Sequence, residues 1–171
     1  GVRKYAKTWF RLDQRYRKFI HHARQSGQAS LLQALSQQVE NLYTNNYLSR
    51  LNVRWQQFVD ACQRWEAAPV IGQAQFFARF VRPYLERNTK ICVLISDAFR
   101  YEVGEELQSL IRREDRFEAE LVPALACLPS YTQLGMAALL PHTTLALAED
   151  GSGEALVDGG SATGSANRAK A

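Results

Sequence analysis

The sequence has 171 residues, of which 46% are hydrophobic and 22% charged, a composition that excludes a chain disordered throughout. Its formal net charge of +4 is unevenly spread, because residues 1–90 carry 15 Lys and Arg against 5 Asp and Glu, whereas residues 91–171 carry 6 against 12. Cys62, Cys92 and Cys127 form no C-x-x-C pair, which excludes a disulfide framework and a thiolate zinc site and favours a reducing, cytoplasmic location.

Residues 1–88 are predicted to form a helical region. Apolar residues recur at alternating steps of four and three from Tyr5 to Ala23, which predicts one amphipathic helix that ends near Gly27. Five cations recur at steps of three and four, four of them one residue before a residue of the apolar stripe, and form a basic ridge about 100° around the helix axis. The residues of this basic ridge are Lys4, Lys7, Arg11, Arg15 and Lys18.

Further helical faces are expected before residue 88. Ser30 and Gln33 resemble a capping box at the start of a second helix. Apolar residues then recur at helical spacing over residues 32–42, 51–65 and 76–85. These patterns predict a helical bundle or a helical arm.

The period of the apolar pattern changes at residue 91. The run from Ile91 to Ile95 is apolar and rich in β-branched residues, which predicts a strand buried on both faces of a parallel sheet. Apolar residues from 103 to 111 predict a following helix with three acidic residues on its solvent side, namely Glu102, Glu105 and Glu106. The charge balance changes sign between the two halves of the chain, which places the domain boundary near Asn88 and Thr89.

Residues 89–171 are therefore expected to be an α/β domain. A second strand over residues 117–122 and a helix over residues 131–140, bounded by prolines, complete the predicted elements. The glycine-rich tail from Asp150 onward predicts a loop. Residues 121–148 hold no charged side chain, but three prolines and several hydroxyl groups interrupt this stretch, which excludes a membrane span.

Asp97 directly follows the first predicted strand. Ligands of open α/β sheets bind beyond the carboxyl ends of the strands. A carboxylate at that position can hold a divalent cation or accept a hydrogen bond from a substrate hydroxyl. The alternative is that Asp97 only caps the following helix, and spacing alone leaves both interpretations open.

Thr132 lies at the start of the predicted helix 131–140. Unpaired N–H groups and the helix dipole favour negative charge on a hydroxyl there, and metal coordination would lower the pKa of that hydroxyl enough to make it a nucleophile. The alternative is a first-turn residue inside a capping box of Ser130 and Gln133. His142 could likewise bind a metal or be an ordinary surface histidine.

Two stretches resemble a known family. Residues 93–102 read VLISDAFRYE and residues 128–141 read LPSYTQLGMAALLP. Both resemble, in this order, the PglZ family of bacterial BREX phage-defence systems. The VDGGSATG of residues 157–164 resembles the next block of the family, so the resemblance covers residues 75–171 well and the helical region more loosely.

PglZ proteins are similar to the alkaline phosphatase superfamily. The resemblance implies the first part of an alkaline-phosphatase-like parallel α/β sheet and a metal-dependent phosphatase or phosphodiesterase. It implies that Asp97 is a metal ligand, and that Thr132 is both a metal ligand and the catalytic nucleophile that attacks phosphorus. Two divalent ions, expected to be zinc, would lie roughly 4 Å apart, and other BREX proteins are the implied partners.

The further Asp and His ligands of such a site are expected beyond residue 171. The chain is therefore interpreted as a truncated internal fragment with half a site and little or no hydrolase activity alone. A different interpretation makes it a non-catalytic scaffold whose basic ridge binds DNA phosphates or a neighbouring defence protein. A basic face of this kind is also common as a solvated helix surface.

Overall fold

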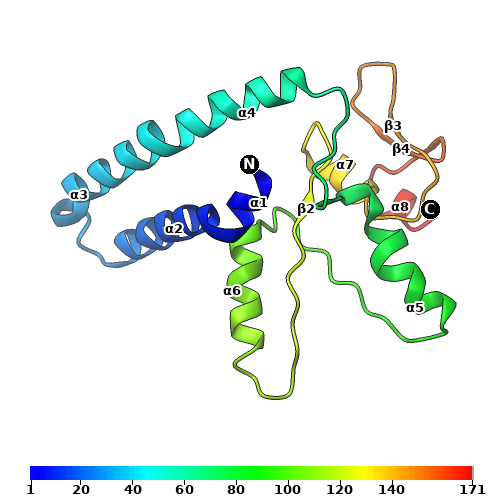
Figure 1. Ribbon diagram of the computed structural model, residues 1–171, viewed down its shortest axis with the longest axis horizontal. Helices are drawn as coiled ribbons and strands as arrows, with labels where there is room; N and C mark the ends of the chain where they lie inside the picture. Colours follow the sequence, from blue (N-terminus) through cyan, green and yellow to red (C-terminus); the bar gives the residue numbers. More distant parts are fainter. Residues whose placement is uncertain (171) are drawn as a thin grey trace. The chain divides into compact units, whose positions relative to one another are not determined.

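The computed structural model describes residues 1–170 (Figure 1). Contacts divide the chain into two compact units, and each unit is assembled from two separate segments. Unit 1 comprises residues 1–65 and 100–121, and unit 2 comprises residues 66–99 and 122–171. The domain boundary expected at residues 88 and 89 stays a prediction, because a grouping of contacts does not test it.

Unit 1 contains two long continuous helices and one shorter helix. The first consists of α1 (Val2–Lys4), the π-helical η1 (Tyr5–Trp9) and α2 (Phe10–Gln25). The second consists of α3 (Ala29–Asn41), the π-helical η2 (Leu42–Leu48) and α4 (Ser49–Ala61). The shorter helix is α6 (Tyr101–Ile111). Figure 1 shows the chain doubling back between α2 and α3, where Gly27 has a φ of 67° that suits glycine.

The amphipathic helix predicted over residues 5–23 is confirmed, and so is the helix after residue 101. The capping box predicted at Ser30 is wrong, because Ser30 lies inside α3 and the N-cap residue, Gln28, makes no side-chain hydrogen bond. The two apolar patterns of residues 32–42 and 51–65 belong to one helical stretch that ends at Ala61.

Unit 2 contains a short parallel sheet and a small antiparallel sheet, so the fold is mixed α/β as predicted. In the first, β1 (Ile71–Gly72) pairs with β2 (Ala124–Leu125). In the second, the strand order is β3 (Leu145–Leu147), β4 (Ala155–Val157) and β5 (Gly160–Ser161). The helical elements are η3 (Gln73–Gln75), η4 (Phe77–Val81), α5 (Arg82–Glu86), α7 (Thr132–Ala137) and α8 (Ser165–Arg168).

The core of unit 2 lies between α7 and the antiparallel sheet. Leu134 and Ala137 of α7 are buried against Ala155 and Val157 of β4, and Ala162 completes the cluster. Because α7 uses this face to bury apolar area, its first residue is held at one end of a packed element. The core of unit 2 therefore fixes the helix on which Thr132 stands.

Three predicted elements are wrong. Residues 91–95 form no strand, and Leu94 is 92% exposed, because within residues 1–170 no segment pairs with this run. The strand predicted over residues 117–122 is replaced by the two-residue β2 further along the chain. The tail after Asp150 is not a loop throughout, since β4, β5 and α8 lie in it.

The orientation of α6 also differs from the prediction. Glu102 was expected to face solvent but is 2% exposed, whereas the apolar residues Val103, Leu107 and Leu110 are between 41% and 51% exposed.

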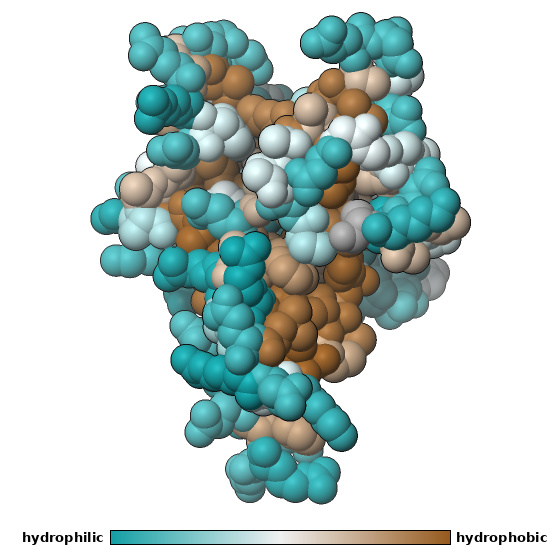
Figure 2. Space-filling model, turned by 90° about the vertical axis from the view of Figure 1, so that its right-hand side faces the viewer, coloured by the Kyte–Doolittle hydropathy of each residue, from teal (hydrophilic) through white to brown (hydrophobic). Residues whose placement is uncertain are grey.

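Apolar side chains are exposed in both units, and Figure 2 shows hydrophobic residues gathered on one face. Within the residues that the structure describes, no helix has the length and apolarity required to cross a membrane.

Candidate active site

Thr132 is the first residue of α7. The preceding residue, Tyr131, is extended, with a φ of −135° and a ψ of 161°, and no side chain caps the helix. The capping box of Ser130 and Gln133 is therefore wrong. Tyr131 donates its phenolic hydrogen bond to the carbonyl of Gly153, which ties the start of α7 to the turn between β3 and β4.

Asp97 lies in a turn of unit 2. Its Oδ1 accepts a hydrogen bond of 2.9 Å from the N–H of Ala98, and Ala98 has a φ of 52°. A non-glycine residue in this region is uncommon and marks local backbone strain. The N-cap residue of α6 is Arg100, so the interpretation of Asp97 as the cap of that helix is wrong.

The side chains of Asp97 and Thr132 meet, although they are 35 positions apart in the sequence. Thr132 Oγ1 lies 3.3 Å from Asp97 Oδ2 and 3.4 Å from Asp97 Oδ1. Both residues are exposed. These distances are longer than the usual 2.7–2.8 Å of an O–H···O hydrogen bond, so the hydroxyl is shared weakly between the two carboxylate oxygens.

The pair offers three oxygen atoms on neighbouring side chains. Hard oxygen donors of this kind suit divalent cations, so the chemistry of the pair fits a metal ion. Among the described residues, no group of three or more His, Cys, Asp or Glu side chains could hold a metal. The role of Asp97 as a metal ligand and that of Thr132 as a ligand and nucleophile stay predictions.

Other acidic and histidine side chains near α7 are engaged elsewhere. His142 Nδ1 lies 2.7 Å from the carbonyl oxygen of Leu140. Asp158 accepts hydrogen bonds from the N–H groups of Thr143, at 2.9 Å, and Thr144, at 2.6 Å. These backbone N–H groups hold the pKa of Asp158 below its usual range. Asp158 therefore joins the loop after α7 to the end of β4.

The five residues of the basic ridge are exposed on the first long helix of unit 1. Lys18 forms an ion pair of 2.7 Å with Glu106 of α6. Lys4 lies 5.0 Å from the ring centroid of Trp9, and Arg11 lies 5.8 Å from that of Phe10. Within residues 1–170, no acidic side chain pairs with Lys4, Lys7, Arg11 or Arg15.

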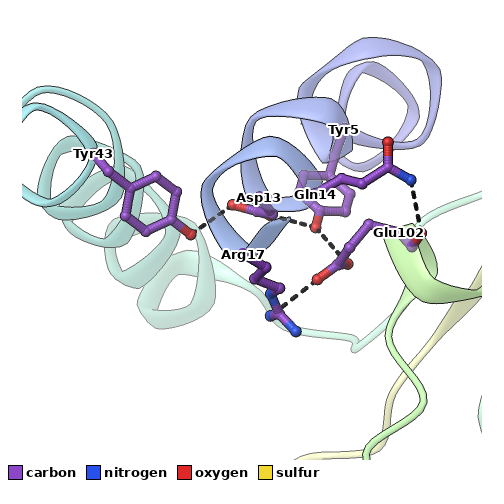
Figure 3. A network of polar contacts seen from close by, with 6 residues as sticks. All are labelled: Tyr5, Asp13, Gln14, Arg17, Tyr43 and Glu102. Atoms are coloured by element: carbon purple, nitrogen blue, oxygen red, sulfur yellow. Dashed lines mark hydrogen bonds and ion pairs between the residues drawn. The ribbon is translucent and has the colours of Figure 1, made fainter. Parts of the chain in front are cut away.

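A polar network inside unit 1 was missed by sequence reasoning (Figure 3). Asp13 accepts hydrogen bonds from Tyr5, at 2.5 Å, and Tyr43, at 2.7 Å. Arg17 Nη2 lies 2.9 Å from the buried Glu102 Oε1. Burial and the hydrogen bond to Asp13 raise the pKa values of Tyr5 and Tyr43. The network joins α2 to α6 and to the second long helix. No motif in the sequence predicts it.

Comparison with known families defines the class of this chain. Residues 76–171 match the family model described as the BREX system PglZ alkaline phosphatase-like domain, so this part of the chain has the sequence of an alkaline phosphatase-like domain. The chain belongs to the PglZ family. The match includes both Asp97 and Thr132.

Two curated relatives extend the similarity to most of the chain. The alkaline phosphatase-like protein BrxZ of Escherichia coli O9:H4 (strain HS) is 42% identical over 171 residues, which cover 96% of this chain and 20% of the relative. The alkaline phosphatase-like protein PglZ of Bacillus cereus (strain H3081.97) is 35% identical over 167 residues, covering 96% of this chain and 19% of the relative. The chain thus spans about a fifth of the length of these relatives. No solved structure matches it.

Proposed function

We propose that this chain contributes a metal-ligating carboxylate and a nucleophilic hydroxyl to a metal-dependent phosphatase or phosphodiesterase. The observation that carries the proposal is the contact between Thr132 Oγ1 and the carboxylate of Asp97 at 3.3 and 3.4 Å. The family match to an alkaline phosphatase-like domain supports it. The strained turn at Ala98 supports it further, because strain of this kind is concentrated at functional sites.

The chemistry of the pair follows from its geometry. Asp97 accepts the weak hydrogen bond of the Thr132 hydroxyl and so orients its oxygen, and with a metal ion bound the same carboxylate would serve as a ligand. When bound, divalent metal ions, for which zinc is our expectation, supply Lewis acidity that lowers the pKa of the hydroxyl and offsets phosphate charge. Attack by the Thr132 oxygen forms a new O–P bond and breaks the P–O bond to the ester group, which leaves as the alcohol with the proton lost from the Thr132 hydroxyl. Water then hydrolyses the phosphoryl-Thr132 ester, which releases the phosphate product and restores the hydroxyl.

The proposal is tested by substitution in a longer PglZ-family protein that contains this chain. Zinc-dependent hydrolysis of p-nitrophenyl phosphate and bis(p-nitrophenyl) phosphate is measured for Thr132→Ala, Thr132→Ser and Asp97→Asn. Loss of the nucleophile should lower kcat by about a thousandfold or more, whereas serine keeps a hydroxyl and should retain part of the rate. Unchanged hydrolysis by Thr132→Ala would show that Thr132 is not the nucleophile.

We expect the 171-residue chain alone to be inactive, because two side chains are fewer ligands than a two-metal site needs. The same assays with added zinc test this expectation. Hydrolysis by the isolated chain that is abolished by Thr132→Ala would contradict it. A role in anti-phage defence, in the cytoplasm and together with other BREX proteins, is part of the same proposal.

A second candidate function is binding to DNA through the basic ridge. The observation that favours it is that Asp13 and Glu102 bind tyrosines and Arg17. Four of the five ridge cations, all but Lys18, therefore have no acidic partner within residues 1–170. If the ridge binds phosphates, log affinity should fall linearly with log salt, and Lys7→Glu with Arg11→Glu should weaken binding to every sequence alike. Absence of binding at low salt would exclude this function.

A further inference from the structure

The side-chain amide of Gln73 holds two backbone groups on either side of Thr132. Gln73 Oε1 accepts a hydrogen bond of 3.2 Å from the N–H of Cys127, and Gln73 Nε2 donates one of 3.1 Å to the carbonyl of Gly135. The donor and the acceptor of one amide are thus both used. We propose that Gln73 is a positioning residue that fixes residues 127–135 and thereby holds Thr132 opposite Asp97.

The sheet register explains why Gln73 reaches this segment. Gly72 of β1 pairs with Leu125 of β2 in a parallel ladder, so Gln73 follows the last pair directly. Its side chain is therefore next to the chain that leaves β2 toward Cys127.

The contact on α7 is a close one. A Cβ atom built on Gly135 would lie 3.4 Å from Gln73 Nε2, at the short end of ordinary van der Waals contact. A methyl group at position 135 would therefore touch the amide at an ordinary distance, and the Gln73 side chain lies directly against the backbone of α7. The buried Leu134 and the hydrogen bond from Tyr131 to Gly153 also hold α7, and Gln73 adds a contact from the segment that follows β1.

Loss of this hold should matter for Thr132 because its contact with Asp97 is already long. Small displacements of a reacting group reduce rates steeply, by up to about a hundredfold for 1 Å. The catalytic part of this inference rests on the proposed function, whereas the positioning part does not. Two readouts are therefore needed, one of which is independent of hydrolysis.

The experiment uses the longer PglZ-family protein that contains this chain and compares three variants. Gln73→Leu removes both hydrogen bonds. Gln73→Glu keeps the acceptor for Cys127 but places a carboxylate against the carbonyl of Gly135. Gln75→Leu is the matched control, because Gln75 lies in the same turn, accepts a hydrogen bond of 3.3 Å from Gly72 and makes no hydrogen bond to α7 within the described part of the chain.

The first readout is amide hydrogen exchange of residues 127–135, given as protection factors. Gln73→Leu should reduce protection of this segment by about tenfold or more, while Gln75→Leu leaves it unchanged. Gln73→Glu should regain protection as pH falls and the introduced carboxyl becomes protonated, because it can then donate to Gly135. Equal protection in Gln73→Leu and Gln75→Leu would overturn the proposal.

The second readout is zinc-dependent hydrolysis. Gln73→Leu should lower kcat by about tenfold to a hundredfold with little change in KM, since substrate binding groups are untouched. A kcat equal to that of Gln75→Leu would overturn the catalytic part of the inference. If the unsubstituted protein hydrolyses neither phosphate ester, the proposed function fails, and hydrogen exchange alone decides whether Gln73 positions the segment.

Discussion

The pair of Asp97 and Thr132 shows what can be predicted at the scale of single residues. Their chemical types, and their places after a β-type run and at a helix start, are sufficient to make both of them candidates. Their meeting at 3.3 and 3.4 Å, beside a turn at Ala98 with a φ of 52°, is a tertiary contact that no sequence pattern indicates. The role of Gln73 could not be predicted either, because the sequence around a glutamine does not indicate which backbone groups its side-chain amide contacts.

The tyrosines of unit 1 should ionise unusually late. Burial raises the pKa of Tyr47 to about 12, and burial with the Asp13 hydrogen bond raises those of Tyr5 and Tyr43. Since the unfolded value is about 10, these groups stabilise unit 1 fully below pH 10, and this contribution is lost as pH rises above it. Absorbance at 295 nm should show phenols that remain protonated past pH 11 in the folded protein.

The matched variant for this titration is Asp13→Asn, which removes the charge but keeps a hydrogen-bond acceptor. It should shift only part of the late absorbance change to lower pH, because burial, the largest cause of the raised pKa values, is unaffected. Titration of all seven tyrosines near pH 10 in the folded wild-type chain would contradict the network.

Asp158 should make unit 2 sensitive to acid. Backbone N–H groups of Thr144 and Thr143 lower its pKa, so its contribution to stability is present above the usual Asp value of about 3.9 and is lost as pH falls through the lowered value. Asp158→Asn should remove this dependence below pH 4, and asparagine tolerates the φ of 48° at this position. Urea unfolding followed by far-UV circular dichroism at pH 7 and pH 3 measures the difference between the two proteins.

At the scale of elements, helices were predictable and strands were not. The amphipathic spacing of residues 5–23 depends only on local geometry, so the helix formed as predicted. A strand needs a neighbour to accept its hydrogen bonds, and the run at residues 91–95 has none within the described residues. Which face of α6 is buried could not be predicted either. Glu102 is buried in an ion pair with Arg17, which lies 85 positions away in the sequence.

The ion pair between Arg17 and Glu102 should stabilise unit 1. Arg17→Leu leaves a buried carboxylate whose side chain is 3% exposed, and we expect it to lower the free energy of unfolding by about 2 kcal/mol. The control is Lys18→Leu, because both partners of the pair between Lys18 and Glu106 are more than 40% exposed and such pairs contribute about 0.5 kcal/mol or less. Urea unfolding followed by tryptophan fluorescence compares the two variants.

Addition of Glu102→Gln to Arg17→Leu should recover part of the lost stability, since the double variant no longer buries an unpaired charge. Equal stability of Arg17→Leu and the unsubstituted chain would show that the pair contributes nothing.

At the scale of the whole molecule, each of the two units has its own internal contacts. All three tryptophans, Trp9, Trp55 and Trp65, belong to unit 1, so their fluorescence reports on that unit. Val157→Ala in the core of unit 2 should reduce hydrogen-exchange protection over residues 144–162 and leave the fluorescence transition unchanged. If the substitution also lowered the urea midpoint of the tryptophan fluorescence transition, the two units would unfold as one cooperative body.

Unit 1 also imposes an order on events at the ribosome. Gln14 donates a hydrogen bond of 3.1 Å to the carbonyl of Glu102, 88 positions later. At about 5 to 20 residues per second, synthesis takes on the order of 4 to 18 s to cover that separation. The first long helix is therefore synthesised several seconds before α6. During that time Gln14 lacks the acceptor of its hydrogen bond.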